Sequence, residues 1–337
     1  MTIEKNYDLS KLNTFGIKAN AKYFVELKTE ADLVELFGLQ EFKDNKKIFL
    51  GGGSNILFAK DFDGIVIVNK LKGINVLEED NENVLVRAMG GECWQDFVDF
   101  TVERGYWGIE NLALIPGTVG ASPIQNIGAY GTELKDSLFN VEAFPIEGGE
   151  KKVFSLEECE LGYRDSVFKN KLKGKYFIAA VTLKLSKKEK KNLSYKILAE
   201  YLEQNKIEVK SPKDISNAVA LIRKSKLPDP KVLGNAGSFF KNVFIDQDKL
   251  DKLQENYKDI PFFKEEGTIK IPAGWLIEQC GWKGKRVGRV GVHDKQALVL
   301  VNHGGATGEE IMNLANEIIA SVKDKFDLVL SPEVNIV

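Results

Sequence analysis

The stretch LIPGTVGASPIQNIGAYG, residues 114–131, decides how the rest of the chain is interpreted. It contains four glycines (Gly117, Gly120, Gly128 and Gly131), two prolines and no charged residue. Glycine lets a ligand approach main-chain N–H groups closely, and proline restricts the backbone, so the loop has a defined shape. An uncharged loop with many backbone donors suits a large, partly apolar ligand that carries phosphates. A set of ordinary turns between strands is the alternative.

A second glycine cluster, GGGSN at residues 51–55, directly follows the apolar run at residues 48–50. It is neither a GxGxxG dinucleotide fingerprint nor a Walker motif, because no GK[ST] follows. Consecutive glycines after a strand can form a backbone nest that binds an anion. Taken alone, this cluster is explained equally well by a tight turn.

The composition excludes several classes of protein. A chain of 337 residues is long enough for two or three domains, and its formal net charge of -2 gives no basic field for nucleic acid. The three cysteines are scattered and the two histidines have no metal-site spacing, so we expect a reducing compartment, no disulfide and no metal. No apolar run reaches the ~20 residues that span a bilayer, and no secretory signal is present. We therefore expect a cytoplasmic protein that binds no membrane.

Local patterns predict the secondary structure. Capping-box pairs at Thr29 with Asp32, Ser155 with Glu158, and Thr307 with Glu310 predict three helix starts, and Ser211-Pro212 predicts a fourth. A further helix is expected over residues 92–104. Strands are expected at residues 23–27, 48–50, 64–69, 84–89, 141–144, 152–154, 176–185 and 297–301. Short mixed strands with few helices indicate an α+β fold and not a doubly wound sheet.

Six uncommon segments occur in one order along the chain: NTFGI (13–17), LGGGSN (50–55), IPGTVGASPIQNIGAYG (115–131), YRD (163–165), GNAGSFFKN (234–242) and PEV (332–334). Together they resemble the UDP-N-acetylenolpyruvoylglucosamine reductase family, flavoenzymes that complete UDP-N-acetylmuramate for peptidoglycan synthesis. The resemblance covers nearly the whole chain, and the tyrosine at residue 195 places it with the larger subclass, in which a tyrosine loop closes over the substrate.

The resemblance implies a fold and a set of domains. It implies a two-lobed FAD-binding domain of the vanillyl-alcohol-oxidase (PCMH) type, followed by an α+β substrate-binding domain. The corresponding boundaries are residues 1–187 for the FAD domain, with lobes of about 1–66 and 67–187, and residues 188–225 for a linker and substrate loop. The substrate-binding domain then covers residues 226–327, and a terminal strand with the catalytic glutamate covers residues 328–337.

The resemblance also implies noncovalent FAD as the cofactor and NADPH as the co-substrate, sharing one pocket with the UDP-sugar substrate in ping-pong order. The two glycine segments match the flavin loops of this fold, which explains why no Rossmann fingerprint is present. The implied FAD contacts are Gly51, Gly52, Gly53, Ser54, Asn55, Pro116, Gly117, Gly120, Ala121, Ser122, Ile127 and Gly128.

Three residues match the catalytic positions of the family. Arg164 matches the arginine that binds the substrate carboxylate, for which a planar guanidinium is well suited, and an ion pair with Asp165 is the structural alternative. Ser238 matches the proton donor, although a serine in a glycine-rich segment is more commonly a turn residue. Glu333 matches the glutamate that polarises the intermediate, which accounts for a carboxylate in an apolar terminal segment.

Five further residues match substrate contacts of the family: Tyr163, Tyr195, Lys226, Asn242 and Gln296. Arg223 could add positive charge to the same region, but a cation near a helix end is the simpler interpretation. Two positions depart from the family pattern. Asn335 stands where an arginine is common, and Phe263 is the nearest counterpart of a tyrosine that faces the substrate.

Two other functions fit parts of the sequence. A sugar or alcohol oxidase of the same fold often attaches FAD covalently through a histidine, whereas residues 1–185 contain no histidine. A nucleotide-sugar binding protein without catalytic activity would carry no yellow chromophore. We expect the reductase, acting as a monomer on UDP-N-acetylglucosamine enolpyruvate.

Overall fold

The computed structural model describes residues 1–265 and 267–337, which form two compact units. The first unit comprises residues 1–7, 21–52 and 63–225, and the second comprises residues 8–20, 53–62 and 226–337. The segment 188–225, expected to be a linker, is part of the first compact unit. The second unit takes two short segments from the expected FAD domain as well as the C-terminal third of the chain.

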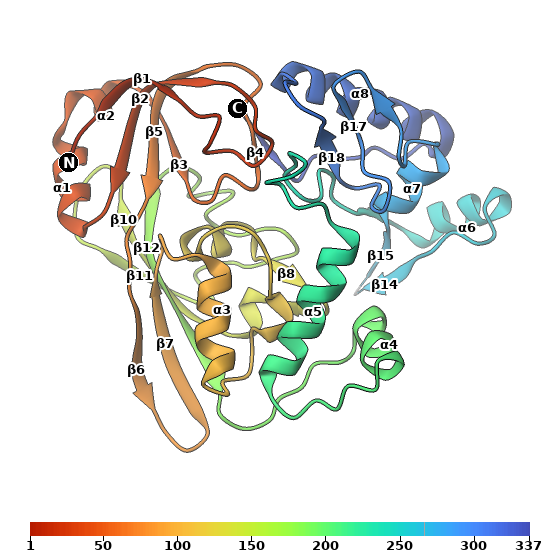
Figure 1. Cartoon of the computed structure of the whole chain (residues 1–337), viewed down its shortest axis with the longest axis horizontal. Helices are drawn as coiled ribbons and strands as arrows, with labels where there is room; N and C mark the ends of the chain where they lie inside the picture. The colour runs from red at the N-terminus through yellow and green to blue at the C-terminus, as the bar shows by residue number, and fades with distance from the viewer. Residues whose placement is uncertain (266) are drawn as a thin grey trace. The chain divides into compact units, whose positions relative to one another are not determined.

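The first unit contains a four-stranded sheet near the N-terminus (Figure 1). Its strands are β1 (Glu4–Asp8), β2 (Asn20–Leu27), β5 (Phe62–Asn69) and β3 (Lys46–Leu50), in this order, with β3 parallel to β5. Two helices, α1 (Glu30–Gly38) and α2 (Gln40–Asp44), connect β2 to β3. The capping box predicted at Thr29 and Asp32 is formed.

A five-stranded antiparallel sheet forms the centre of the first unit, in the order β11-β10-β12-β7-β6. These strands are β6 (Ile74–Glu79), β7 (Asn83–Met89), β10 (Leu138–Pro145), β11 (Lys152–Ser155) and β12 (Tyr176–Ser186). Side chains alternate between the two faces of a strand, and both faces of β12 are buried. On one face Phe177 meets Phe49 of β3, with ring centroids 5.4 Å apart.

The other face of this sheet packs against helices. Val181 and Leu183 of β12 share a hydrophobic core with α3 (Trp94–Glu103), α4 (Lys196–Gln204) and α5 (Pro212–Lys226). Ile215, Val219 and Ile222 form the buried face of α5. Both α3 and α5 are visible in the first unit in Figure 1.

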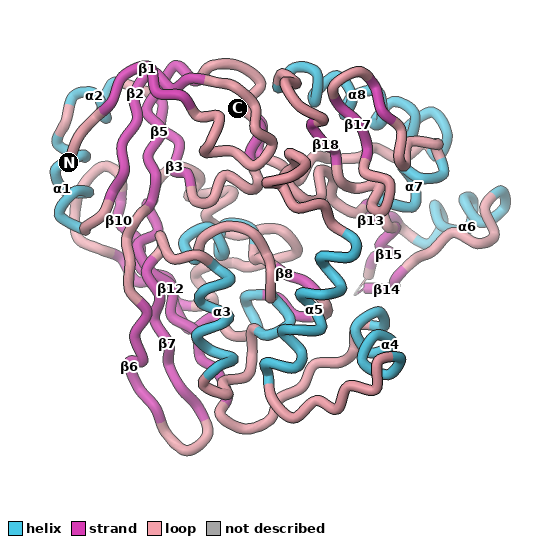
Figure 2. The backbone as a smooth tube through the Cα atoms, viewed as in Figure 1, coloured by secondary structure: helices cyan, strands magenta, loops and turns pink. Residues whose placement is uncertain are grey.

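The chain between β7 and β10 consists of α3 followed by short elements and loops (Figure 2). After α3 come the 3-10 turns η1 (Glu110–Leu112), η2 (Val119–Gln125) and η3 (Leu134–Asp136). A small hairpin, β8 (Gly128–Ala129) with β9 (Thr132–Glu133), lies between η2 and η3. Tyr130 and Gly131 at its tip have φ values of 48° and 80°, as a two-residue turn of this hand requires.

The described part of the second unit contains two three-stranded sheets, a two-stranded sheet of β4 (Ile56–Leu57) and β19 (Asn335–Ile336), and three helices. The strands of one three-stranded sheet are, in order, β13 (Val243–Ile245), β15 (Thr268–Ile271) and β14 (Phe263–Glu265). The strands of the other are β16 (Arg286–Val287), β17 (Val290–Val292) and β18 (Leu300–Asn302). The helices are α6 (Gln247–Asn256), α7 (Ala273–Gln279) and α8 (Gly308–Phe326). The capping box predicted at Thr307 is formed at the start of α8, and one face of this helix is buried.

Three local predictions are wrong. Ser155 and Glu158 do exchange the predicted hydrogen bonds, but the segment that follows is a turn and not a helix. The terminal strand β19 contains only Asn335–Ile336, paired with β4 (Ile56–Leu57), so Glu333 precedes the strand. The strand expected from residue 297 begins only at Leu300. None of the described helices is both long and apolar enough to cross a membrane.

Candidate functional site

The first unit brings parts of the two glycine segments together. A Cβ atom on Gly52 would lie 2.9 Å from Gly117 Cα, and one on Gly51 would lie 2.5 Å from Thr118 Oγ1. Real side-chain contacts are longer than these distances, so only glycine permits this approach of the two backbones. Gly51 and Gly52 of the LGGGSN segment therefore pack directly against Gly117 and Thr118 of the IPGTVG segment.

Thr118 adds an unsatisfied polar atom at the same place. Its hydroxyl oxygen is buried and has no hydrogen-bond partner among the residues that the structure describes. Buried polar atoms without partners are uncommon in folded proteins and suggest a missing ion, water or ligand. A glycine cradle beside an unsatisfied hydroxyl fits a phosphate-bearing cofactor such as FAD. Thr118 is not among the FAD contacts that the resemblance implies, although a hydroxyl residue in the glycine-rich GTVG segment was a sequence signal for it.

Several predicted FAD contacts use their main-chain N–H groups inside the protein. The N–H of Gly120 donates to Gly90 O, that of Ala121 to Thr118 O and that of Ile127 to Ser122 O. The Ser122 hydroxyl donates to Val119 O and is buried. These four hydrogen bonds therefore hold the loop in its shape.

The other predicted FAD contacts are distributed between the units. Gly53, Ser54 and Asn55 belong to the second unit, whereas Gly51 and Gly52 belong to the first. Gly53 has a left-handed φ of 64°. Asn55 O accepts hydrogen bonds from the main-chain N–H and the side-chain amide of Asn335. Asn335, which replaces a common arginine of the family, therefore fixes the backbone of the glycine segment in this chain.

Arg164 lies in a tight turn of the first unit. Gly162 and Asp165 exchange main-chain hydrogen bonds of 3.1 and 3.2 Å across it, and Arg164 has a φ of 52°. This left-handed backbone costs an ordinary residue about 1–2 kcal/mol, so neighbouring contacts must hold it. The Arg164 guanidinium donates from Nη2 to Gly128 O at 2.8 Å. The carboxylate of Asp165 instead accepts hydrogen bonds from Asn170.

A second arginine, Arg223 on α5, lies near enough to Arg164 for the two positive charges to interact. Its Nε is buried and has no hydrogen-bond partner among the described residues, although the residue as a whole remains partly exposed. Burial lowers the pKa of the Arg223 guanidinium, and the positive charge of Arg164 lowers that pKa further, while Tyr130 acts in the opposite direction. An anion bound here would relieve both unfavourable effects. Arg223 does lie near the C-terminal end of α5, as the simpler interpretation from the sequence expects, and its Nε is in addition buried.

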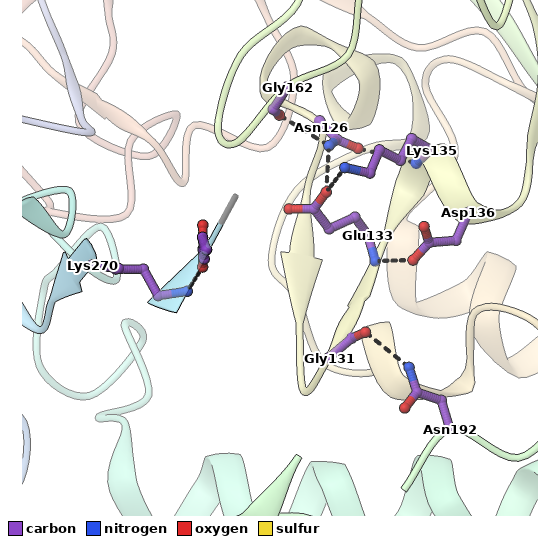
Figure 3. Close-up of polar contacts among 9 residues, drawn as sticks. Asn126, Gly131, Glu133, Lys135, Asp136, Gly162, Asn192 and Lys270 are labelled. Carbon is purple, nitrogen blue, oxygen red and sulfur yellow. Dashed lines mark hydrogen bonds and ion pairs between the residues drawn. The ribbon is translucent and has the colours of Figure 1, made fainter. Parts of the chain in front are cut away.

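Two tyrosines complete this part of the first unit. Tyr130 at the tip of the β8–β9 hairpin and Tyr195 at the N-cap of α4 meet edge to face, with ring centroids 5.3 Å apart. Asn192 ties the loop before Tyr195 to the hairpin by donating to Gly131 O at 2.8 Å (Figure 3). Asn111 donates to the carbonyls of both Tyr130 and Asn192. Tyr195 is 43% exposed, so its ring is available to a ligand. We call Tyr130, Arg164, Tyr195 and Arg223 the arginine–tyrosine cluster.

Tyr163 precedes Arg164 in the turn, and the guanidinium carbon of Arg164 lies 5.5 Å from the centre of its ring. This distance allows a cation–π contact. Tyr163 thus belongs to the same part of the first unit as the arginine–tyrosine cluster.

The second unit brings Ser238 close to Glu333 in the fold. Residues 238–241 are extended and lie between two other segments: Phe239 N–H donates to Leu298 O, and Glu333 N–H donates to Phe239 O, each at 2.7 Å. Phe239 and Phe240 are fully buried and anchor this segment, whereas Ser238 and Glu333 are partly exposed. Ser238 therefore lies in an extended segment and not in a turn. The segment that carries Glu333 is hydrogen-bonded to the next residue, Phe239.

The remaining predicted substrate residues also belong to the second unit. Asn242 Oδ1 accepts a hydrogen bond from Ala273 N at the first residue of α7. Gln296 approaches the same helix, because a Cβ atom on Gly274 would lie 3.3 Å from Gln296 Oε1. Lys226 is the last residue of α5 and the first residue of the unit's C-terminal segment. Among the described residues, no group of three or more His, Cys, Asp or Glu side chains is arranged to hold a metal ion.

Comparison with protein families identifies both halves of the chain. Residues 21–150 match the family "FAD binding domain", and residues 229–337 match the family "UDP-N-acetylenolpyruvoylglucosamine reductase, C-terminal domain". The UDP-N-acetylenolpyruvoylglucosamine reductase of Flavobacterium johnsoniae is 47% identical over 339 residues, and that of Amoebophilus asiaticus is 49% identical over 338 residues. In both comparisons the alignment covers 100% of each chain.

Solved structures show the same fold. The UDP-N-acetylenolpyruvylglucosamine reductase of Thermus caldophilus aligns over 100% of this chain and 99% of its own, with a TM-score of 0.68 at 22% identity. A solvent-stable cholesterol oxidase aligns over 98% of this chain and 86% of its own, with a TM-score of 0.52 at 10% identity. The predicted α+β fold, with a PCMH-type FAD-binding domain and a C-terminal α+β domain, is confirmed.

Proposed function

Because the chain belongs to the UDP-N-acetylenolpyruvoylglucosamine reductase family, we propose that it reduces the enolpyruvyl group of UDP-N-acetylglucosamine enolpyruvate to the lactyl group of UDP-N-acetylmuramate, a step of peptidoglycan synthesis. NADPH is the proposed electron donor. The full-length identity of 47% to a reductase of this name supports this assignment. The arginine–tyrosine cluster supports it physically, because its partly buried guanidinium groups favour an anionic substrate.

FAD binding is supported by the matched domain at residues 21–150 and by the glycine cradle at Gly51, Gly52 and Gly117. We propose that this cradle, together with the Thr118 hydroxyl, holds a phosphate-bearing part of the cofactor. FAD held there would supply the redox chemistry, namely the transfer of a hydride equivalent from NADPH to the terminal carbon of the enolpyruvyl group. The protein residues must then bind the substrate, stabilise charge and supply a proton.

Arg164 is the proposed ligand of the substrate carboxylate. Hydride addition to the terminal carbon pushes negative charge into that carboxylate, and a preorganised guanidinium stabilises the charge as it develops. Arg164 suits this role because its backbone turn and its hydrogen bond to Gly128 O fix it in advance. Arg223 adds a second positive charge, for the same carboxylate or for the diphosphate.

Ser238 is the proposed proton donor to the carbon beside the carboxylate. Serine is a weak acid, so this role requires a strongly basic carbon acceptor, which the intermediate after hydride addition provides. Glu333 is proposed to polarise this intermediate, and its position on the segment hydrogen-bonded to Phe239 supports a joint role with Ser238. Tyr163, Tyr195, Lys226, Asn242 and Gln296 remain proposed substrate contacts.

We further propose that the enzyme acts as a monomer in the cytoplasm, without nucleic-acid or membrane partners. The scattered cysteines support a reducing compartment.

The experiment that tests the function combines the purified protein with NADPH and UDP-N-acetylglucosamine enolpyruvate. We expect NADPH oxidation that depends on the enolpyruvyl substrate, with one product molecule formed per NADPH and two hydrogen atoms gained in its mass. NADPH oxidation without any change in the nucleotide sugar would contradict the proposal.

A further inference from the structure

Asn126 occupies an unusual position beside the turn that carries Arg164. Its side chain is fully buried, and its backbone has the left-handed values φ 43° and ψ 67° at the end of η2. The side-chain amide donates to Glu133 Oε2 and to Gly162 O, each at 3.0 Å, and its oxygen accepts from Lys135 N at 3.0 Å (Figure 3). Both amide N–H groups and the oxygen are therefore used.

These three hydrogen bonds join separate segments of the first unit. Glu133 belongs to strand β9 of the hairpin, Lys135 belongs to η3, and Gly162 is the first residue of the turn that contains Arg164. The Gly162 carbonyl receives Asn126 in addition to the main-chain N–H of Asp165 that closes the turn. Asn126 thereby fixes the orientation of the peptide group from which the turn starts.

The turn needs such support because Arg164 itself is left-handed, with a φ of 52°. A side chain with a Cβ atom is disfavoured in this conformation, and it persists only where the surroundings determine it. Two other contacts also hold the turn: Asn170 donates to the Asp165 carboxylate, and Lys169 donates from Nζ to Arg164 O at 3.1 Å. Both of these side chains are on the C-terminal side of the turn, whereas Asn126 supports its N-terminal side.

The position of the Arg164 guanidinium also depends on the segment that Asn126 fixes. Gly128, two residues after Asn126, accepts the hydrogen bond from Arg164 Nη2 and pairs with Glu133 in the hairpin. Asn126 is bonded to Glu133 as well. The backbone of Arg164 and the carbonyl that receives its guanidinium are therefore both fixed by one buried amide.

We propose that Asn126 is a positioning residue for Arg164: it holds the turn and the hairpin in register, so that the guanidinium is in place before the substrate arrives. This inference rests on the proposed role of Arg164 as the carboxylate ligand. Preorganised charge is effective because it needs no rearrangement during the reaction, and a displacement of about 1 Å can reduce a rate by roughly 100-fold.

The first test compares the two half-reactions of the holoenzyme by stopped-flow absorbance of the flavin. Asn126→Gly keeps the left-handed backbone accessible but removes the three hydrogen bonds. We expect flavin reduction by NADPH within about twofold of the original enzyme, and reoxidation by the enolpyruvyl substrate slowed roughly 10- to 100-fold. Equal changes in both half-reactions would overturn the inference.

A double-mutant cycle separates positioning from general destabilisation. If Asn126 acts through Arg164, adding Asn126→Gly to Arg164→Ala should change the reoxidation rate by less than about twofold. A further loss as large as that of the single variant would overturn the inference. Ser321→Ala is the matched control, since it removes the hydroxyl that accepts from Trp282 Nε1 in the second unit, and it should not change the ratio of the half-reactions.

A third variant keeps the inference testable if Asn126→Gly does not fold. In Asn126→Asp with Glu133→Gln, the 126–133 hydrogen bond is restored with its donor reversed, but a carboxylate now faces Gly162 O. We expect a folded holoenzyme that still reoxidises slowly, and recovery of the original rate would overturn the inference. A different result would contradict the proposed role of Arg164 itself: Arg164→Ala alone would leave the reoxidation rate unchanged.

Discussion

Arg164 donates a hydrogen bond from Nη2 to Gly128 O at 2.8 Å, so an uncharged glycine-rich segment fixes the position of the proposed carboxylate ligand. The segment at residues 114–131 was expected to contact the cofactor through its backbone. In the first unit its N-terminal part packs against Gly51 and Gly52, while its C-terminal part forms the hairpin that holds Arg164. One continuous loop therefore supports both the proposed cofactor cradle and Arg164.

Gly128→Ala tests the contact between Gly128 and Arg164. A Cβ atom at this position would lie 3.0 Å from Glu133 Cγ and 3.1 Å from Arg164 Nη1, so the guanidinium must move. We expect the KM for the enolpyruvyl substrate to rise and its flavin reoxidation rate to fall by roughly 10-fold or more. Rapid-mixing measurements of both half-reactions check this. An unchanged reoxidation rate would show that the position of the Arg164 guanidinium against Gly128 does not affect this half-reaction.

Ser238→Ala tests the proton donor. It should leave flavin reduction by NADPH nearly intact and slow reoxidation by the enolpyruvyl substrate by about 10²- to 10⁴-fold, the range of general acid catalysis. Single-turnover measurements of each half-reaction provide the comparison. A similar loss in both steps would refute the assigned role, because it would indicate damage to the cofactor site.

Thr118→Val tests the proposed cofactor cradle, because we expect opposite effects on the stability of the apoprotein and on the affinity for FAD. Valine has nearly the same shape but lacks the buried hydroxyl, which has no partner among the described residues. The apoprotein should therefore keep or slightly increase its free energy of unfolding, whereas FAD should bind more weakly by about 0.5–1.5 kcal/mol. Thermal denaturation of the apoprotein and fluorescence titration with FAD measure these two quantities. Unchanged FAD affinity would exclude the hydroxyl as a cofactor contact.

The stability at acidic pH should depend on Glu142. The hydrogen bond from Arg87 is the main cause that lowers the pKa of Glu142 to about 2, and Lys151 forms a second ion pair with it at 2.8 Å. A carboxyl whose pKa is lower in the folded state stabilises the protein above its unfolded pKa. This stabilisation is lost as the pH falls from about 4.5 toward 2.

Glu142→Gln should therefore reduce the free energy of unfolding near neutral pH by on the order of 2 kcal/mol, and the difference from the original protein should shrink below pH 4.5. Denaturant titrations at several pH values measure it. Glu82→Gln is the control, because Glu82 forms an exposed ion pair with Lys188, which contributes about 0–1 kcal/mol. A difference that does not vary with pH would contradict the assignment.

Much of the fold follows from local sequence signals. The capping boxes at Thr29 and Thr307 mark real helix starts because short polar side chains satisfy the first free N–H groups there. Ser155 and Glu158 form the same hydrogen bonds, but the residues that follow them form turns and no helix. Local hydrogen bonding can therefore be read from the sequence, whereas the continuation of a helix depends on tertiary packing.

The candidate site was harder to predict than the fold. Arg164 and Tyr130 adopt left-handed backbones that favour glycine or asparagine, so their turns carry no local sequence signal. The sequence places Arg223 near the end of a helix, but the burial of its Nε depends on tertiary packing. The family resemblance supplied the proposed roles of Arg164, Ser238 and Glu333. The supporting contacts of Asn126 and Thr118 depend on three-dimensional structure.

The most direct test of the proposed reaction is a two-step anaerobic titration of the purified protein, followed by its visible absorbance. Addition of NADPH should bleach the flavin, and subsequent addition of UDP-N-acetylglucosamine enolpyruvate should restore the oxidised spectrum with the formation of UDP-N-acetylmuramate. A flavin that NADPH bleaches but that the enolpyruvyl substrate leaves colourless would contradict the proposed function.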